Sequence, residues 1–259
     1  MADLMNGEKA ERWHRREFVG TIVKAIGVAP LLTMPLGGFA NENPGRNRNF
    51  TVQEVIDLIL TSIPGAPFSK TVDTIKSGDA SWLVTGIVTT MFATDAVIEH
   101  AVNLGANFII AHEPTFYNHL DDVAWLKEDE VYLHKKNLLE KNKIVVWRFH
   151  DYIHSHKPDG VLMGVIDTVG WHQYYDESNP DILSLPAISL GELIGQLKSK
   201  LGIEHLKFIG DSSQQCRKIA LMPGAAGGTS QINLLRKEKP DVLICGEINE
   251  WETAEYIRD

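Results

Sequence analysis

The sequence predicts an α/β fold, made of two related βαβ lobes with mixed, mainly parallel sheets. Apolar segments with strand character alternate with amphipathic, helix-like segments along most of the chain. In addition, residues 82–113 and residues 217–247 follow the same order of strand, small-residue turn, helix, loop and short apolar strand. Two parallel strands need a crossover of this kind, so we interpret each copy as one parallel βαβ unit.

The first lobe has clear helix and strand signals. A helix over residues 51–63 begins at Thr51, and Glu54, three positions later, completes the pattern of a capping box. The other elements expected in this lobe are a strand at 82–91, a helix from Thr94 to about 104, a strand at 108–111, a helix at 128–141 and a strand at 144–149.

The second lobe repeats this alternation. Its expected elements are a strand at 162–171, a helix at 189–201, a strand at 218–222, a helix at 230–237 and a strand at 242–245. Gly202 is expected to end the first of these helices, because glycine readily adopts the left-handed conformation of a helix terminus. Glu113 and Glu247 each follow the last strand of a βαβ unit, at the sheet edge where open α/β proteins bind ligands.

Length and composition are those of a globular protein with a substantial core. The chain has 259 residues, of which 44% are apolar and 23% are charged. Its net charge of −9 argues against nucleic acid as the main partner. The two cysteines, Cys216 and Cys245, are too few for a disulfide framework or a cysteine zinc cluster.

The first forty residues resemble an export signal. Arg15 and Arg16 precede a mildly apolar stretch that ends near the small residues Gly38 and Ala40. We expect a twin-arginine-like signal peptide at residues 1–40, a linker at 41–50 and the folded domain at 51–259. The protein would then be exported to the periplasm, or associated with a membrane only through an uncleaved signal. The alternative is an ordinary amphipathic helix in a cytoplasmic protein.

Two of the predicted strands end in residues that bind metals. His112 and Glu113 directly follow the strand at 108–111. The strand at 144–149 is followed by His150, Asp151, His154 and His156. If the two strands are neighbours, these side chains meet at one edge of the sheet. Imidazole and carboxylate ligands together suit Zn²⁺, Fe²⁺ or Mn²⁺ rather than Ca²⁺ or Mg²⁺.

The sequence does not decide whether residues 150–156 are helical or extended. His150 and His154 share a face only in a helix, whereas His154 and His156 share one only in an extended segment. We interpret His119 and His134 as surface histidines or as core hydrogen-bonding residues, because that is the commoner role of an isolated histidine.

One longer segment carries a resemblance to a known family. Residues 95–119 read DAVIEHAVNLGANFIIAHEPTFYNH. The segment resembles the signature of the NIF-three-like family, also called dinuclear metal-centre proteins or GTP cyclohydrolase I type 2-like proteins. In that family a helix and a strand lead into two adjacent histidines followed by proline. A later strand leads into a histidine and, four residues on, an aspartate. The resemblance covers residues 50–259 and implies the NIF-three-like α/β fold.

The resemblance also implies a set of metal ligands. His112 matches the first metal histidine, and Glu113 stands where the second histidine usually is. His150 matches the histidine of the second motif, and His154 stands at its aspartate position. Near the C-terminus the stretch CGEINEW resembles a Thr-Gly-acid motif, with Glu247 as the acid. The exchanges at Glu113 and His154 roughly conserve ligand number and charge, which favours a retuned site.

Further ligands would follow in the family, where a last strand and helix supply a histidine and a glutamate. The chain stops at Asp259. We therefore expect either a truncated gene product with an incomplete site, or a site that other residues complete. Two metal ions are expected if the site is complete.

The function implied by the resemblance is hydrolysis. A water that bridges two metal ions has a lowered pKa, and Asp151 or Glu247 would act as general base. The expected substrate is a small molecule such as a nucleotide or a phosphoester, and the expected assembly is a toroidal homo-hexamer. A non-catalytic metal-binding protein and an assembly scaffold are the alternatives.

Overall fold

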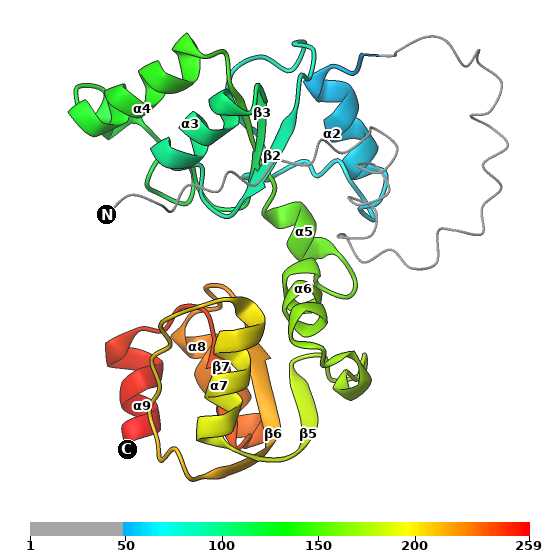
Figure 1. Ribbon diagram of the computed structural model, residues 1–259, viewed down its shortest axis with the longest axis vertical. Helices are drawn as coiled ribbons and strands as arrows, with labels where there is room; N and C mark the ends of the chain where they lie inside the picture. Colours follow the sequence, from blue (N-terminus) through cyan, green and yellow to red (C-terminus); the bar gives the residue numbers. More distant parts are fainter. Residues whose placement is uncertain (1–48) are drawn as a thin grey trace, which may run out of the picture. The chain divides into compact units, whose positions relative to one another are not determined.

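The computed structural model describes residues 49–259. The predicted signal at 1–40 and all but the end of the predicted linker lie outside the described residues. The described part forms two compact units, one ending at Val161 and the other beginning at Leu162, and each is treated by itself below (Figure 1). Within residues 49–259, no helix has both the length and the apolar character needed to cross a membrane.

A four-stranded sheet organises the first unit. Its strands are β1 (Ile75–Ser77), β2 (Ile87–Thr90), β3 (Phe108–Ala111) and β4 (Val145–Arg148). They lie in the order β1-β4-β3-β2. The strands β2, β3 and β4 are parallel, and Ala111 at the end of β3 pairs with Arg148 at the end of β4. Strand β1 runs antiparallel to β4.

Helices cover both faces of this sheet. They are α2 (Val52–Leu60), α3 (Asp95–Asn103) and α4 (Glu130–Lys141), with a 3₁₀ turn at Ala124–Leu126 and a short α5 (Asp151–Ser155) after β4. Figure 1 shows α3 and α4 on one side and α2 on the other. Alternate strand residues supply the two cores: Ile109 and Val146 join the first cluster, and Phe108 and Trp147 join the second.

The helix starts in this unit follow the sequence signals. Thr51 and Glu54 form the predicted capping box at α2. Thr94 caps α3, as predicted, by accepting a hydrogen bond from the backbone of Val97. These polar residues satisfy N–H groups that have no partner inside the helix, which fixes where each helix begins.

The second unit contains a three-stranded sheet in the order β5-β6-β7. Its elements are α6 (Gly160–Val169), a 3₁₀ turn (His172–Tyr174), β5 (Ile182–Ser189), α7 (Leu190–Leu201), β6 (Gln215–Met222), α8 (Gly228–Glu238), β7 (Val242–Cys245), a π-helical turn (Glu250–Ala254) and α9 (Glu255–Arg258). Strands β6 and β7 are parallel, and β5 is antiparallel to β6. Helices α6 and α7 pack their apolar residues onto β6.

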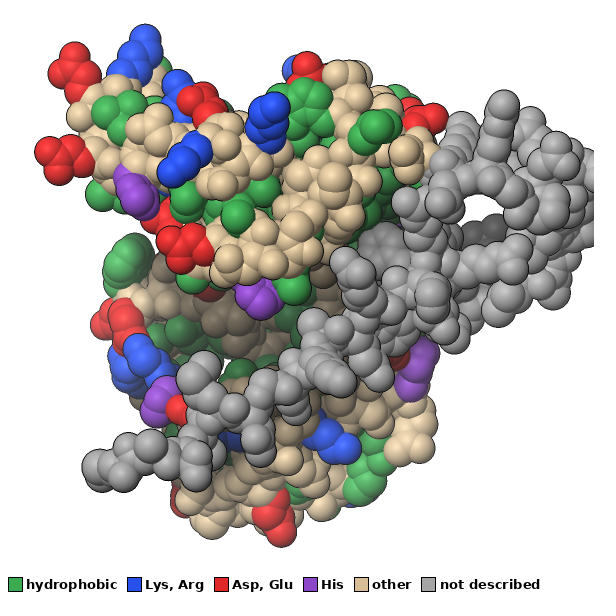
Figure 2. Space-filling model, turned by 45° about the horizontal axis from the view of Figure 1, so that its top comes forward, with side chains coloured by type: hydrophobic (Ala, Val, Ile, Leu, Met, Phe, Trp, Pro, Cys, Tyr) green, Lys and Arg blue, Asp and Glu red, His purple; other side chains and the backbone are tan. Residues whose placement is uncertain are grey.

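The predicted fold class is confirmed. The segments β2–α3–β3 and β6–α8–β7 are the two predicted parallel βαβ units, and each sheet adds one antiparallel strand. In Figure 2, acidic and basic side chains are interspersed with apolar and polar ones on the face that is shown.

The strand predicted at 162–171 is wrong, because this segment is helix α6. Its buried residues, Leu162, Ile166 and Val169, recur at helical spacing, but the apolar residues between them hide that period. Strand β5 was not predicted. Pro186 argues against a strand, and the structure places it where the pairing of β5 with β6 is interrupted.

A close backbone contact in the second unit predicts the effect of one substitution. A Cβ atom at Gly246 would lie 2.6 Å from the backbone nitrogen of Gly224 and 2.7 Å from its carbonyl oxygen. We expect Gly246→Ala to destabilise the protein by about 2 kcal/mol, because backbone must shift to admit the methyl group. The measurement is the midpoint of unfolding in urea.

The matched control for this experiment is Gly195→Ala. Gly195 is an exposed residue within α7, and a Cβ atom there would meet nothing within 4 Å. This substitution should stabilise the protein by about 0.5 kcal/mol or more, because alanine loses less conformational freedom in a helix. A Gly246→Ala protein as stable as the unsubstituted one would contradict the close contact.

Candidate metal centre

Three histidines meet beyond the carboxyl ends of two adjacent strands. His112 directly follows β3, His150 follows β4 at the start of α5, and His154 lies one turn later in α5. The parallel pairing of β3 with β4 brings both strand ends to one edge of the sheet. Of the two conformations left open for the second group, the structure has the helical one, so His150 and His154 share a face.

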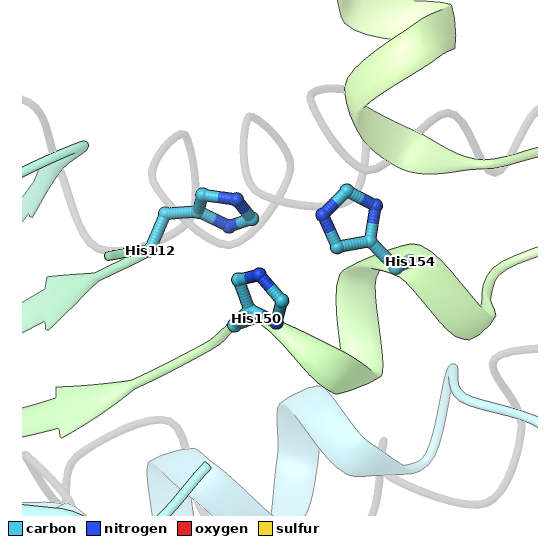
Figure 3. Close-up of side chains that lie close together, drawn as sticks. All are labelled: His112, His150 and His154. Atoms are coloured by element: carbon cyan, nitrogen blue, oxygen red, sulfur yellow. The ribbon is translucent and has the colours of Figure 1, made fainter. Parts of the chain in front are cut away.

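The spacing of the three rings suits a common ion. Each histidine offers a ring nitrogen, and these atoms all lie within 4.8 Å of one another (Figure 3). The ring centres are 4.8 Å apart for His112 and His150, 5.1 Å for His112 and His154, and 4.9 Å for His150 and His154. Two imidazoles bound to one tetrahedral ion at about 2 Å have ring centres about 5 Å apart. The ring-centre distances therefore match those expected around one shared ion, and small rotations of the rings would bring the nitrogens to the roughly 3.3 Å separation that such an ion imposes.

Hydrogen bonds fix the orientation of all three rings. Each Nδ1 lies near an oxygen: the Phe149 carbonyl at 3.2 Å for His112, Asp151 Oδ1 at 3.0 Å for His150 and Asp159 Oδ2 at 2.8 Å for His154. When Nδ1 carries the proton and donates it to that oxygen, Nε2 is left with a free lone pair. Metal-binding histidines are commonly held in this way.

His112 and His154 differ in their proton affinity. Burial lowers the pKa of His112, which favours the neutral form that binds a metal. The hydrogen bond that His154 donates to the Asp159 carboxylate raises the pKa of His154, against the opposing effect of burial. A metal must therefore compete with a proton at His154, and its affinity should fall as the pH is lowered.

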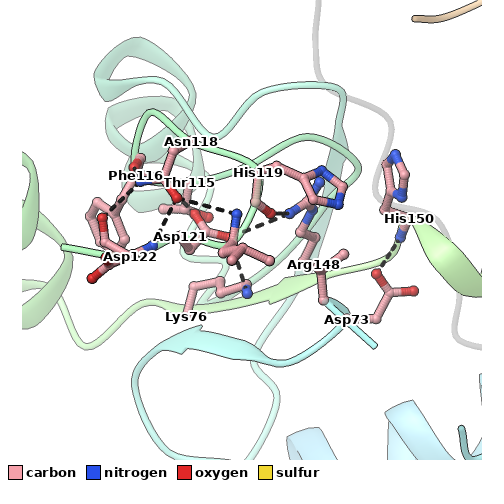
Figure 4. A network of polar contacts seen from close by, with 12 residues as sticks. Asp73, Lys76, Thr115, Phe116, Asn118, His119, Asp121, Asp122, Arg148 and His150 are labelled. Carbon is pink, nitrogen blue, oxygen red and sulfur yellow. Dashed lines mark hydrogen bonds and ion pairs between the residues drawn. The ribbon is translucent and has the colours of Figure 1, made fainter. Parts of the chain in front are cut away.

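A distant aspartate caps the helix that carries two of these histidines. Asp73 is 5% exposed and accepts a hydrogen bond of 2.8 Å from the backbone N–H of His150 (Figure 4). It accepts a second, also of 2.8 Å, from the backbone N–H of Tyr152. No side chain within α5 caps its start. Burial raises the pKa of Asp73, while the backbone N–H groups favour its charged form. The loop before β1 thereby fixes the first turn of α5.

The carboxylate of Asp151, like that of Asp73, accepts several hydrogen bonds. Its Oδ2 accepts hydrogen bonds from Thr71 Oγ1 at 2.9 Å and from the Val72 N–H at 3.0 Å, and its Oδ1 faces His150. Burial acts to raise the pKa of Asp151, but these hydrogen bonds outweigh it and hold the pKa below its usual value. This arrangement orients His150. The predicted role of Asp151 as general base stays a prediction.

The remaining predicted site residues lie outside the three-histidine cluster. Glu113 Oε1 is 4.0 Å from His112 Nε2, so this carboxylate is close to the cluster. Glu247 belongs to the second unit, where it follows β7 and accepts a hydrogen bond from Gln231 on its carbonyl oxygen. His156 ends α5. Metal binding by Glu113 and catalysis by Glu247 stay predictions.

Two supporting residues were missed in the sequence. Asp73 has no local signal, because 77 residues separate it from His150. Asp159 is close in sequence to His154, and this proximity was the available signal. Besides holding His154, Asp159 accepts a hydrogen bond from the Val161 N–H through its other oxygen, Oδ1, at 2.8 Å.

Comparison with known proteins agrees with the family resemblance. A family model described as Duf34/NIF3 (NGG1p interacting factor 3) matches residues 54–259. A GTP cyclohydrolase 1 type 2 homolog of Clostridium perfringens is 25% identical over 189 residues, which cover 69% of this chain and 70% of that protein.

Solved structures show the same fold. A Bacillus cereus protein related to NIF3 has a TM-score of 0.66 at 15% identity, covering 82% of this chain and 86% of that one. Reduced HcgD from Methanocaldococcus jannaschii has a TM-score of 0.55 at 18% identity, covering 80% and 82%. Because the family model spans most of the sequence, the chain belongs to the Duf34/NIF3 (NGG1p interacting factor 3) family.

Proposed function

We propose that this protein binds a divalent transition metal at His112, His150 and His154 and hydrolyses a small molecule there. The observation that carries the proposal is the set of three ring-centre distances near 5 Å. Imidazole nitrogens suit Zn²⁺ and Fe²⁺, and a nearby carboxylate such as Glu113 also suits Mn²⁺. Proximity to His112 Nε2 supports Glu113 as a further ligand.

Hydrolysis is the chemistry that such a site supports. A metal held by three protein ligands keeps a position for water and lowers the pKa of that water towards neutrality. Asp151 and Asp159 hold the imidazoles of His150 and His154, so these rings need not reorganise when a substrate binds. The name of the Clostridium perfringens relative supports a nucleotide as substrate, and other phosphoesters fit the same chemistry.

The second candidate function is metal binding without catalysis. It is favoured by the contacts of Asp151, whose carboxylate is engaged by Thr71, Val72 and His150 and is a poor general base. Export through residues 1–40, a second metal ion and homo-oligomerisation are further proposals, which rest on the sequence and the family resemblance.

The first test is the metal content of purified protein after incubation with Zn²⁺ or Co²⁺ and removal of excess ion. We expect the unsubstituted protein to retain metal and His112→Ala to retain none in stoichiometric amount, because one of three nitrogen ligands is lost. His205→Ala is the control, since His205 is 97% exposed and lies in the other unit. Equal metal content in the unsubstituted protein and the His112 variant would refute the site.

The support from Asp159 gives a second prediction. Asp159→Ala should weaken metal affinity by about 10- to 100-fold, because His154 loses the acceptor that orients it. Asp167→Ala is the matched control: Asp167 also pairs with a histidine, His172, at 3.3 Å, but in the other unit. Titration calorimetry measures both affinities. The hypothesis fails if both variants bind metal equally well.

Turnover separates the two candidate functions. Release of phosphate or of a hydrolysed base should be measured for a panel of nucleotides and phosphoesters, with and without added Mn²⁺, Fe²⁺ or Zn²⁺. The hydrolase proposal predicts metal-dependent turnover that His112→Ala abolishes. Stoichiometric metal without turnover across the panel would favour the non-catalytic function.

A further inference from the structure

An additional histidine stands beside the cluster. His119 lies in the loop between β3 and the 3₁₀ turn at Ala124–Leu126, and its side chain is exposed. Its ring centre is 5.7 Å from that of His150, in an edge-on arrangement. The three ring separations within the cluster are 4.8 to 5.1 Å, so the fourth ring is less than 1 Å more distant from its neighbour.

The loop that carries His119 is highly ordered by its own hydrogen bonds. The Asn118 Nδ2 group donates to the carbonyls of Phe116 at 3.1 Å and Asp122 at 2.7 Å. Its Oδ1 accepts from the backbone N–H groups of Leu120 at 3.2 Å and Asp122 at 3.0 Å. One amide side chain thereby fixes the backbone on both sides of His119.

A buried guanidinium ties this loop to the metal cluster. Arg148, at the end of β4, is 0% exposed, and its Nε donates to the carbonyl of His112 at 3.2 Å. Its Nη1 donates to the carbonyl of His119 (Figure 4). The same rigid, planar group therefore sets the spacing between the backbones of His112 and His119.

Buried charges hold the guanidinium itself in place. Asp121 Oδ2 lies 3.6 Å from Arg148 Nη1 and 3.0 Å from Lys76 Nζ, and Oδ1 of Asp121 accepts from the Phe116 N–H at 2.7 Å. The side chains of Lys76 and Asp121 are 7% and 4% exposed. Such groups are costly to bury unless they are paired, so loss of any one of these partners would disturb the loop.

From these contacts we propose that His119 is a further nitrogen ligand of the metal centre, on its His150 side. This inference rests on the metal binding proposed above. The backbone of His119 is fixed, while its exposed ring is free to turn about its side-chain bonds towards an ion beside His150. A fourth imidazole would favour Zn²⁺ and Co²⁺ over Mg²⁺ and Mn²⁺, which prefer oxygen ligands. Water could still bind to such an ion if the coordination expands to five ligands.

The test compares Zn²⁺ and Co²⁺ titrations of the unsubstituted protein, His119→Ala and His134→Ala. His134 is the matched control. It is exposed in the same unit, and its Nε2 lies 3.5 Å from Asp95 Oδ2, away from the three-histidine cluster. His119→Ala should lower the affinity at least about tenfold or remove one bound ion per chain, and should change the visible spectrum of bound Co²⁺. His134→Ala should leave all three readouts unchanged.

The outcomes separate this inference from the proposed function. If the unsubstituted protein binds no metal, the proposed function fails and the inference fails with it. If His112→Ala loses the metal while His119→Ala keeps the affinity, stoichiometry and Co²⁺ spectrum of the unsubstituted protein, only the inference is overturned. Equal unfolding temperatures of the metal-free variants would show that the loss at His119 is not a folding defect.

Discussion

The parallel pairing of β3 with β4 is the constraint on which the three-histidine cluster depends. Ala111 and Arg148 are partners in this pairing, so the chain leaves both strands at the same level, and His112 and His150 emerge side by side. If one of these strands slipped by one residue against the other, its buried side chains would turn to the wrong faces of the sheet and the two imidazoles would move apart. The cores on the two faces of the sheet therefore also determine the distance between two histidines of the cluster.

Around this pairing, the protein uses buried polar groups to fix short segments that have little intrinsic stability. Helix α5 is only five residues long, and an isolated helix of that length does not form in water. The carboxylate of Asp73, 77 residues before His150, accepts hydrogen bonds from the first turn of α5 and holds that turn in place. Arg148 and Asp121 do the same for the loop after β3. Part of the rigidity at the site therefore comes from contacts between segments that are remote along the chain, in addition to the local contacts of Asn118, Asp151 and Asp159.

Local signals explain which parts of this arrangement could be predicted from the sequence. Capping residues Thr51 and Thr94, the short strand β3 and the two βαβ units have signals within a few residues, and the structure has them where they were predicted. The continuous apolar run in α6 is compatible with either a strand or a helix. Pro186 within β5 argued against a strand there. At the site, strand ends pointed to His112 and His150. The contribution of Asp73 depends on tertiary contact alone, and the position of His119 depends on the conformation of a loop.

The carboxylate of Asp159 has one more consequence. Its Oδ2 holds the imidazole of His154, and its Oδ1 accepts from Val161 in the first turn of α6, the helix through which the chain passes from one unit into the next. Both oxygens belong to one rigid planar group, so it cannot rotate to suit one partner without disturbing the other. The orientation of His154 and the start of α6 are thus coupled through one carboxylate, so a change of geometry at either is transmitted to the other.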